Sequence, residues 1–498
     1  MCLSQLVVFT GSVRMIASRP GNLLWQLAAV LVILASVMPL LTDYPYLALA
    51  PGLGLLFLFL IGRRPELGLY AIIFLIPFGN FRDLGGPLEK IKIHWLLALV
   101  LLLVLALRLL SDRTLMARFR SNLWPWFLLF LAISLLSTFF SDYKSNAAEQ
   151  VVLTLVAIVF FALTISLTDK TGVTRHIPAV IAASVSIGSL SAVVGTLFHV
   201  AVFSEGDTFS RSTGGTADPN ALAMQIIFGL PFVVFWLTHA RHRLVKLLAL
   251  AMLLINIVAM VGTFSRSGAI VMGLTLAILS FINVKGLTSR QLGLLFAGAA
   301  AVMLVGAAMV PQSFWERQAT LVSSKQDRSL NRRGSYLIVA RDAIVDRPIL
   351  GHGPGTFRDL YTTSDWAQRY DKKGSTNRRF AHNTYLEVLV GTGLLGFFFF
   401  IALLLTAMRN LLRARRLFLK CDDGYHADQV LHYLVALCVL LLYLTMFSDV
   451  FQKFMLLSIG LSQVWLRVAD TVAVEKAPVG AGPATTGFDY WPPLREER

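Results

Sequence analysis

The chain has 498 residues, of which 56% are hydrophobic and only 14% are charged, and its formal net charge at pH 7 is +16. A soluble protein cannot bury so much apolar surface, and many continuous apolar runs approach the ~18–20 residues needed to cross a bilayer. Runs that are continuous rather than alternating exclude a β-barrel. The composition therefore predicts an all-α, polytopic transmembrane helical bundle. Basic loops account for its positive charge, and no nucleic-acid partner is predicted.

Hydropathy predicts twelve to fourteen membrane spans, the second and third of which can form one interrupted unit. The predicted spans are 23–41, 46–62, 67–80, 93–110, 123–140, 151–168, 177–203, 220–238, 246–263, 268–284, 292–311, 384–408, 430–448 and 451–468. Three cysteines, Cys2, Cys421 and Cys438, are too few and too scattered for a disulfide framework or a metal site.

The distribution of Lys and Arg orients these spans. With the N-terminus inside, the inside segments hold most of the basic residues, including the cluster from Arg413 to Arg416. The short outside loops hold only Arg82, Lys90, Lys92, Lys144, Arg211, Arg266 and Lys453. Because positive charge accumulates on the cytoplasmic side, both termini are predicted to be cytoplasmic and the one long loop is predicted to face outward.

Together these patterns divide the chain into successive segments. A cytoplasmic N-terminus (1–22) precedes transmembrane helices joined by short loops (23–311). A large, partly helical outer loop follows (312–383), and then C-terminal transmembrane helices with a basic cytoplasmic loop (384–470). The remaining cytoplasmic tail (471–498) is rich in Pro, Gly, Ala and Thr and is predicted to be disordered.

The large outer loop is the only outward segment long enough to fold over the membrane. Its periodicity predicts a helix from Arg332 to Asp346, ended by Arg347-Pro348, and a glycine-rich turn follows from Gly351 to Gly355. The loop holds more basic than acidic residues and several aromatic ones. Sugars stack on aromatic rings and phosphates pair with Arg and Lys, which favours a glycan-phosphate ligand. The alternative is an amphipathic loop that lies on lipid headgroups.

The first of three candidate outer sites is the run from Arg211 to Asn220. Asp218 is suited to cap the helix that follows, with Pro219 as the first helical residue. The glycines of this run allow backbone N–H groups and the helix N-terminus to approach an anion. The plain alternative is an ordinary loop with a helix cap.

The second candidate site is the tight turn from Thr263 to Gly268, between two apolar spans. Its Arg266 lies at the outer edge of the membrane, where positive charge is disfavoured. Either the guanidinium reaches lipid headgroups or it is held for an anionic ligand. Because a guanidinium binds a pyrophosphate through paired hydrogen bonds, the second interpretation is favoured.

The third candidate site is Phe380 to Glu387, where the large loop meets an apolar helix predicted from about Thr384 to Met408. His382 titrates near neutral pH, which suits a general base at a membrane surface. Asn383 is a plausible helix N-cap, and Glu387 follows one turn later on the same face. A lone histidine at such a boundary is more often structural. The helix dipole also favours a carboxylate in the first turn without any catalytic role.

In combination these motifs resemble the O-antigen ligase and polysaccharide polymerase superfamily, over roughly Arg211 to Met408. The N-terminal third is similar only as a set of helices. The motifs are Arg347 to Phe357, His382 to Glu387, a span with Gly391, Gly393 and Gly396, Asp218-Pro219-Asn220 and Ser265 to Gly268. Members of this family usually have twelve spans, so a count of fourteen here departs from the pattern.

The resemblance implies a bacterial inner-membrane enzyme that moves a glycan from undecaprenyl pyrophosphate to an acceptor hydroxyl on the periplasmic side. It implies that Arg266 and Arg211 bind the pyrophosphate and that His382 acts as the base, without metal or cofactor. The residues that it implies as supporting are Asn383, Glu387, Tyr385, Asp218, Asn220 and Ser265. Its partners would be the lipid-linked donor, membrane lipid, and either a lipid A core or another glycan as acceptor.

Several functions stay open at this stage. A ligase and a repeat-unit polymerase use the same parts, and the sequence does not separate them. A secondary transporter would need charged residues in mid-membrane helix segments and paired broken helices, whereas the middles of these spans are almost free of charge. A third possibility is a non-catalytic scaffold of a cell-surface assembly, but this function would not explain why arginines lie at the outer edge of the membrane.

Overall fold

The computed structural model describes residues 50–78, 93–198, 202–203, 211–216, 218–284, 328–370 and 379–476. By its internal contacts the chain divides into two units, residues 1–67 and 68–498. The predicted spans 23–41 and 292–311 lie outside the described residues, as do the predicted N-terminal segment 1–22 and most of the predicted tail, 477–498. Within the first unit, α2 (Ala50–Arg63) is an apolar helix followed by the beginning of α3.

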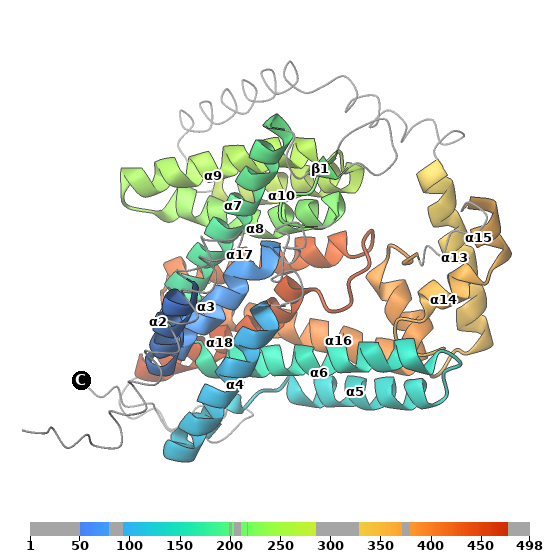
Figure 1. Cartoon of the computed structure of the whole chain (residues 1–498). Coiled ribbons are helices and arrows are strands. Elements are labelled where there is room, and N and C mark those ends of the chain that lie inside the picture. The colour runs from blue at the N-terminus through green and yellow to red at the C-terminus, as the bar shows by residue number, and fades with distance from the viewer. Residues whose placement is uncertain are drawn as a thin grey trace, which may run out of the picture. The chain divides into compact units, whose positions relative to one another are not determined.

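Helices make up nearly all of the described chain in the second unit (Figure 1). The first of them are α3 (Pro65–Leu75), which begins in the first unit, the 3-10 turn η3 (Ile76–Phe78), α4 (Ile93–Ser111), the 3-10 helix η6 (Arg113–Phe119), α5 (Trp124–Phe139), α6 (Lys144–Leu167), the π-helical turn η7 (Gly172–His176) and α7 (Ile177–Leu197). After two short strands come α8 (Pro219–His239), α9 (Arg243–Gly262), α10 (Arg266–Val284), α13 (Arg328–Asp346), α14 (Phe357–Thr362), α15 (Asp365–Tyr370), α16 (Thr384–Lys420), α17 (Gly424–Tyr443) and α18 (Lys453–Glu475).

Each predicted span that falls largely on described residues coincides with a helix, and the all-α polytopic membrane fold is confirmed. Among the described residues, seven helices are long and apolar enough to cross a membrane, or eight if η6 and α5, bent by 73°, form one span. The seven are α6, η7 with α7, α8, α9, α10, α16 and α17, and three shorter apolar helices accompany them. Such helices are stable in lipid because their backbone N–H and C=O groups form hydrogen bonds with each other within the helix.

Several predicted boundaries differ from the structure, and two of these differences lie beside the candidate sites or in the basic inner loop. The span predicted over 177–203 ends at Leu197, and Val202–Phe203 instead forms strand β1, antiparallel to β2 (Arg211–Ser212). β-Branched and aromatic residues suit an extended pairing of this kind. The helix predicted to end near Met408 continues to Lys420, because Ala414 and Phe418 are buried on its inner face while Arg413 approaches Asp470 at 3.6 Å.

The helices of the second unit form two groups that meet at α17 (Figure 1). In one group α16 packs against α5, α17 and α18, and α18 also packs against α6. In the other group α8 packs against α7, α9 and α10. Both α8 and α10 contact α17. The start of α16 and the starts of α8 and α10 are therefore held against the same helix, although they are far apart in the sequence.

Helix α16 is interrupted at Gly393, where φ is 63° and ψ is −168°. The glycine-rich turn of the large loop fills the break, because Leu394 N donates to Pro348 O (2.8 Å) and His352 N donates to Val390 O (3.0 Å). A Cβ atom on Gly393 would lie 2.3 Å from the carbonyl carbon and oxygen of Ile349. Glycine is therefore needed in α16 and in the glycine-rich turn because the two backbones approach each other closely there.

We expect Gly393→Ala to destabilise the protein by about 3 kcal/mol or more. A non-glycine residue in this backbone region costs about 1–3 kcal/mol by itself, and the clash with Ile349 adds to it. The measurement is the thermal unfolding midpoint together with limited proteolysis of the loop. Gly273→Ala in α10 is the matched control, since nothing lies within 4 Å of its added Cβ atom. Equal stability of the two variants would contradict this account of the break.

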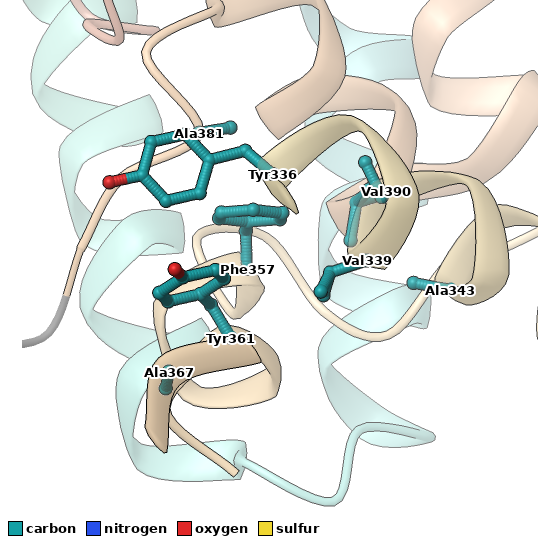
Figure 2. Packing of buried hydrophobic residues seen from close by; sticks show 9 residues of the cluster. Tyr336, Val339, Ala343, Phe357, Tyr361, Ala367, Ala381 and Val390 are labelled. Atoms are coloured by element: carbon teal, nitrogen blue, oxygen red, sulfur yellow. The ribbon is translucent and has the colours of Figure 1, made fainter. Parts of the chain in front are cut away.

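An aromatic cluster fixes the described part of the large loop as a unit (Figure 2). The predicted loop helix is confirmed: α13 covers it, and one face of the helix is buried. The buried members of the cluster are Tyr336, Val339, Ala340, Ala343, Phe357, Tyr361, Ala367, Ala381 and Val390. Figure 2 shows the rings of Tyr336, Phe357 and Tyr361 gathered beside Ala381. Since Ala381 immediately precedes His382, the cluster determines where that histidine lies.

Candidate functional site

Arg211 lies in β2, and two hydrogen bonds direct its half-buried side chain toward the starts of two helices. Its Nε donates to the carbonyl oxygen of Thr263 (2.9 Å), and one terminal nitrogen donates to Asn220 Oδ1 (3.4 Å). The neighbouring Ser212 hydroxyl donates to Ala192 O (3.0 Å). The strand and this bond to α7 therefore keep Arg211 between the beginning of α8 and the turn before α10.

The beginning of α8 is capped as the sequence predicts. Asp218 accepts a hydrogen bond from Asn220 N (2.7 Å), and Pro219 is the first helical residue. The hydroxyl of Thr216 donates to Asp218 O (2.8 Å). Because the cap holds the backbone of Asn220, its side-chain oxygen is held facing both Arg211 and Ser265.

The turn between α9 and α10 carries Arg266 as the first residue of α10. Just before it, Phe264 has a φ of 51°, an unusual value for a residue with a side chain. The hydroxyl of Ser265 donates to Asn220 Oδ1 (2.9 Å) and accepts from Gly268 N (3.2 Å). The structure therefore brings the first two predicted sites together through Asn220, with local backbone strain of the kind found at functional sites.

Tyr443, at the end of α17, joins this cluster and was not predicted from the sequence. Its hydroxyl donates to Asn220 O (3.1 Å) and lies 3.4 Å from the Ser265 hydroxyl. The next residue, Leu444, accepts a hydrogen bond at its carbonyl from Thr384 N (2.9 Å). Residues 443–444 thus connect the Arg211 cluster with the start of α16. A tyrosine at the end of an apolar helix is ordinary in membrane proteins, so its position in the sequence carried no signal.

His382 lies two residues before the start of α16 and has a φ of 51°. Its ring stacks against that of Tyr336, with 5.9 Å between ring centroids and 26° between the planes. The following Asn383 caps α16 as predicted, accepting from Tyr385 N (3.0 Å) and Leu386 N (3.2 Å). The cap and the stacked ring hold the imidazole from both sides, in a backbone conformation that costs free energy for a non-glycine residue.

Glu387 is buried, with 4% of its surface exposed, and it accepts a hydrogen bond from Ala381 N (2.7 Å). The hydroxyl of Ser448 also bonds to this carboxylate and accepts from Asn383 N (3.0 Å). The carboxylate therefore holds in place the backbone of Ala381, the residue before His382.

Tyr385 is a structural neighbour of this segment. Its hydroxyl donates to Leu441 O (2.9 Å) in α17. The bond joins the first turn of α16 to the end of α17, beside the contact between Thr384 and Leu444. Tyr385 therefore keeps the helix start in place, and this hydroxyl hydrogen is already committed to a backbone carbonyl.

Burial lowers the pKa of His382 to about 4, and nearby arginines contribute to the shift. The positive charges of Arg333, Arg379 and Arg332 act in the same direction, whereas the carboxylate of Asp218 raises the pKa. The imidazole is therefore neutral at pH 7 and able to accept a proton. The influence of Asp218 also shows that His382 lies near the capped start of α8.

The three predicted sites thus meet at the helix ends on one side of the second unit. Arg211, Asn220 and Ser265 share hydrogen bonds, Arg266 follows Ser265 directly, and His382 joins through residues 443–444 and Asp218. Two or more guanidinium groups beside a neutral imidazole can bind a polyanion and take up a proton next to it.

Comparison with known families agrees with this arrangement. Residues 251–401 match the family described as O-antigen ligase. The matched stretch contains Arg266, the glycine-rich turn of the loop and His382, while Arg211 and the cap of α8 precede it. The resemblance stated from the motifs is confirmed over these residues. Among curated proteins, none matches this chain.

Proposed function

Since this chain carries the O-antigen ligase domain in residues 251–401, we propose that it transfers a glycan from undecaprenyl pyrophosphate to an acceptor hydroxyl. The observation that carries the proposal is the hydrogen-bonded cluster that joins Arg211 to Ser265, beside Arg266 and His382. A pyrophosphate needs paired cationic donors, and a hydroxyl nucleophile needs a neutral base. This cluster supplies both at the ends of membrane helices, where a lipid-linked donor would present its headgroup.

In the proposed reaction, His382 takes the proton of the acceptor hydroxyl while the hydroxyl oxygen forms a bond to the anomeric carbon of the glycan. The bond from that carbon to the pyrophosphate breaks, and undecaprenyl pyrophosphate leaves with the electron pair. Arg266 and Arg211 offset the charge that grows on the leaving group. Attack from the opposite face inverts the anomeric centre. Neither metal nor cofactor takes part in this scheme.

Glu387 and Asn383 act through His382 in this scheme. The carboxylate holds Ala381 N and the amide caps α16, so the residue between them is fixed on both sides. Asp218 and Asn220 similarly fix the segment between Arg211 and Ser265. Positioning of this kind matters because small displacements of a reacting group lower the rate strongly.

The active face is proposed to be periplasmic, in a bacterial inner membrane. Segments that the charge distribution assigns to the outer side do meet: Arg347 binds Asp142 (2.7 Å), and Ser141 donates to His352 O (2.5 Å). Segments assigned to the inner side meet as well, since Arg467 donates to Arg118 O (3.2 Å). This grouping is consistent with the predicted topology.

A secondary transporter is less well supported. Transporters bind substrates where a broken helix exposes backbone groups near the middle of the membrane. The break in α16 is filled by the large loop, whose backbone bonds to Val390 and Leu394. The candidate site lies instead at helix ends, which suits a headgroup reaction.

The direct test uses the purified full-length protein with an undecaprenyl-pyrophosphate-linked glycan. Formation of a glycosylated acceptor together with free undecaprenyl pyrophosphate is the expected result. Two acceptors separate the possible roles: a lipid A core reports ligase activity, and a second lipid-linked repeat unit reports polymerase activity. Failure with both acceptors, under conditions that keep the protein folded, would reject the proposal.

We expect the pH dependence of kcat/KM to differ from that of kcat. Neutral His382 is the proposed base, so kcat/KM should hold near neutral pH and fall only as the pH falls through about 4. Bound pyrophosphate adds negative charge that raises the pKa of His382, so kcat should begin to fall at a higher pH. Both profiles can be measured with the same donor. Superimposed profiles would contradict placement of the pyrophosphate beside His382.

A further inference from the structure

We propose that the turn that ends α13, with Val345 and Ile349 at its surface, is inserted into the bilayer at the end of the membrane helices where the candidate site lies. The partner is the lipid of that leaflet, at the boundary between headgroups and acyl chains. This inference does not depend on the proposed function. It gives the large loop a second attachment besides the aromatic cluster.

Two apolar side chains of this turn are largely exposed. Val345 is 74% exposed and Ile349 is 60% exposed, whereas the opposite face of α13 is buried in the aromatic cluster. These fractions are as large as that of Phe398, which is 59% exposed in the membrane helix α16. Exposed apolar residues that gather at one place indicate contact with another apolar phase.

Hydrogen bonds place this turn beside the membrane part of α16. Leu394 N donates to Pro348 O (2.8 Å). Leu395 N donates to Ile349 O (3.3 Å). Both leucines are exposed apolar residues of a helix that is apolar enough to cross a membrane. Ile349 therefore continues the lipid-facing surface of α16.

The end of α5 gives the depth of the turn. The hydroxyl of Ser137 donates to Gly391 O (2.8 Å), so Gly391 is level with the last turn of α5. Leu395 is four residues further along α16, toward the middle of the membrane. Because Ile349 is bonded to Leu395, it lies at the depth of the apolar surface of α5, which ends in the exposed Phe139.

The backbone of the turn is suited to lipid. Arg347 O accepts a hydrogen bond from Gly351 N (3.1 Å), and the next two carbonyls accept the bonds from α16. Pro348 has no N–H group that would need a partner. Irregular backbone is tolerated at membrane depth only where the protein satisfies its polar groups, and the three consecutive carbonyls of this turn meet that condition.

Charged side chains mark the water boundary next to the turn. The guanidinium of Arg347 pairs with Asp142 (2.7 Å), which follows the end of α5, and with Asp346 (3.7 Å). The ammonium of Lys144 lies over the ring of Phe139, 5.9 Å from its centroid. Basic and aromatic side chains gather where headgroups meet acyl chains. The apolar part of the turn therefore lies just inside this boundary.

Insertion of the turn would fix the depth of the large loop. Helix α13 also carries Tyr336, whose ring stacks on His382. The turn at one end of α13 would thereby set the distance of His382 from the membrane surface. The aromatic cluster fixes the shape of the loop, and the lipid contact would fix its height.

The test uses the full-length protein in nanodiscs that hold one copy each, with an NBD fluorophore on Ile349→Cys or Val345→Cys and the native cysteines replaced by alanine. Quenching by iodide in water is compared with quenching by a phospholipid that carries a nitroxide on its acyl chain. We expect the lipid to quench both positions and iodide to quench them about tenfold less than Gln368→Cys, since hydrocarbon excludes an ion.

Two further variants are the controls. Gln368→Cys in α15 is exposed on the same loop and should be quenched by iodide alone. Phe398→Cys faces lipid in α16 and should be quenched by the nitroxide lipid alone. Thermal unfolding midpoints confirm that each variant is folded. If Ile349→Cys lowers the midpoint, Val345→Cys serves as the reporter one helical turn earlier.

Two results would overturn the inference. Equal iodide quenching of Ile349→Cys and Gln368→Cys would place the turn in water. Resistance of Ile349→Cys to both quenchers would show that protein covers the turn, and lipid would not be its partner. Neither result involves glycan transfer, so the proposed function holds or fails separately.

Discussion

Replacement of His382 by alanine is expected to lower kcat by about 10²–10⁴-fold, because the acceptor hydroxyl would lose its proposed general base. The KM for the donor should change little, since the arginines proposed to bind the pyrophosphate stay in place. The measurement is the rate of glycan transfer by the purified protein, with donor and acceptor varied separately. Membrane levels of the variant should match those of the wild type.

A second histidine provides the control for this experiment. His242 is exposed at the N-cap of α9 and makes no side-chain cap bond, so His242→Ala should transfer glycan at the wild-type rate. Tyr336→Phe keeps the ring that stacks on His382 and removes only the hydroxyl. This variant therefore shows whether the ring alone is enough to position His382. Near-normal activity in His382→Ala would remove this residue from the mechanism.

Replacement of Arg266 by alanine is expected to lower kcat/KM by about 10²–10³-fold, because the leaving pyrophosphate loses a guanidinium that offsets its charge. Arg266→Lys should recover only part of this loss, since an ammonium cannot form the paired hydrogen bonds of a guanidinium. Transfer rates and inorganic pyrophosphate binding should decrease together in the alanine variant.

Arg243 is the matched control for Arg266. It is likewise the first residue of an apolar helix, α9, but it is exposed at the other end of that helix from the candidate site. If Arg243→Ala and Arg266→Ala reduced transfer equally, a general effect of charge at helix starts would explain both results. The proposed pyrophosphate site would then have no support from this experiment.

Local features of the site follow from the sequence because their physics is local. Asp218 and Asn383 cap their helices through bonds to residues two or three positions later, which residue type and spacing predict. The loop helix ends before Arg347-Pro348 for an equally local reason. A local argument also gave a non-catalytic reason for Glu387, since the helix dipole favours a carboxylate in the first turn of a helix.

Other features depended on contacts between distant segments. Tyr443 reaches Asn220, and Ser448 reaches Asn383, across more than sixty positions of sequence. Strand β1, which pairs with the strand that holds Arg211, forms where a helix was predicted to continue, because this pairing outweighs the apolar run. The reason for glycine at positions 351 and 393 follows only from the tertiary structure, in which the large loop fills the break in α16.

By itself, the sequence determined that this protein is a polytopic helical membrane protein and that its residues 251–401 resemble the O-antigen ligase family, because hydropathy, caps and motifs are properties of short segments. Only the tertiary structure decided that Arg211, Ser265 and His382 share one end of the helices and that the ring of Tyr336 stacks on His382. The reason is physical: the packing of α8, α10 and α16 around α17 sets these distances, and helix packing joins residues that no local pattern connects.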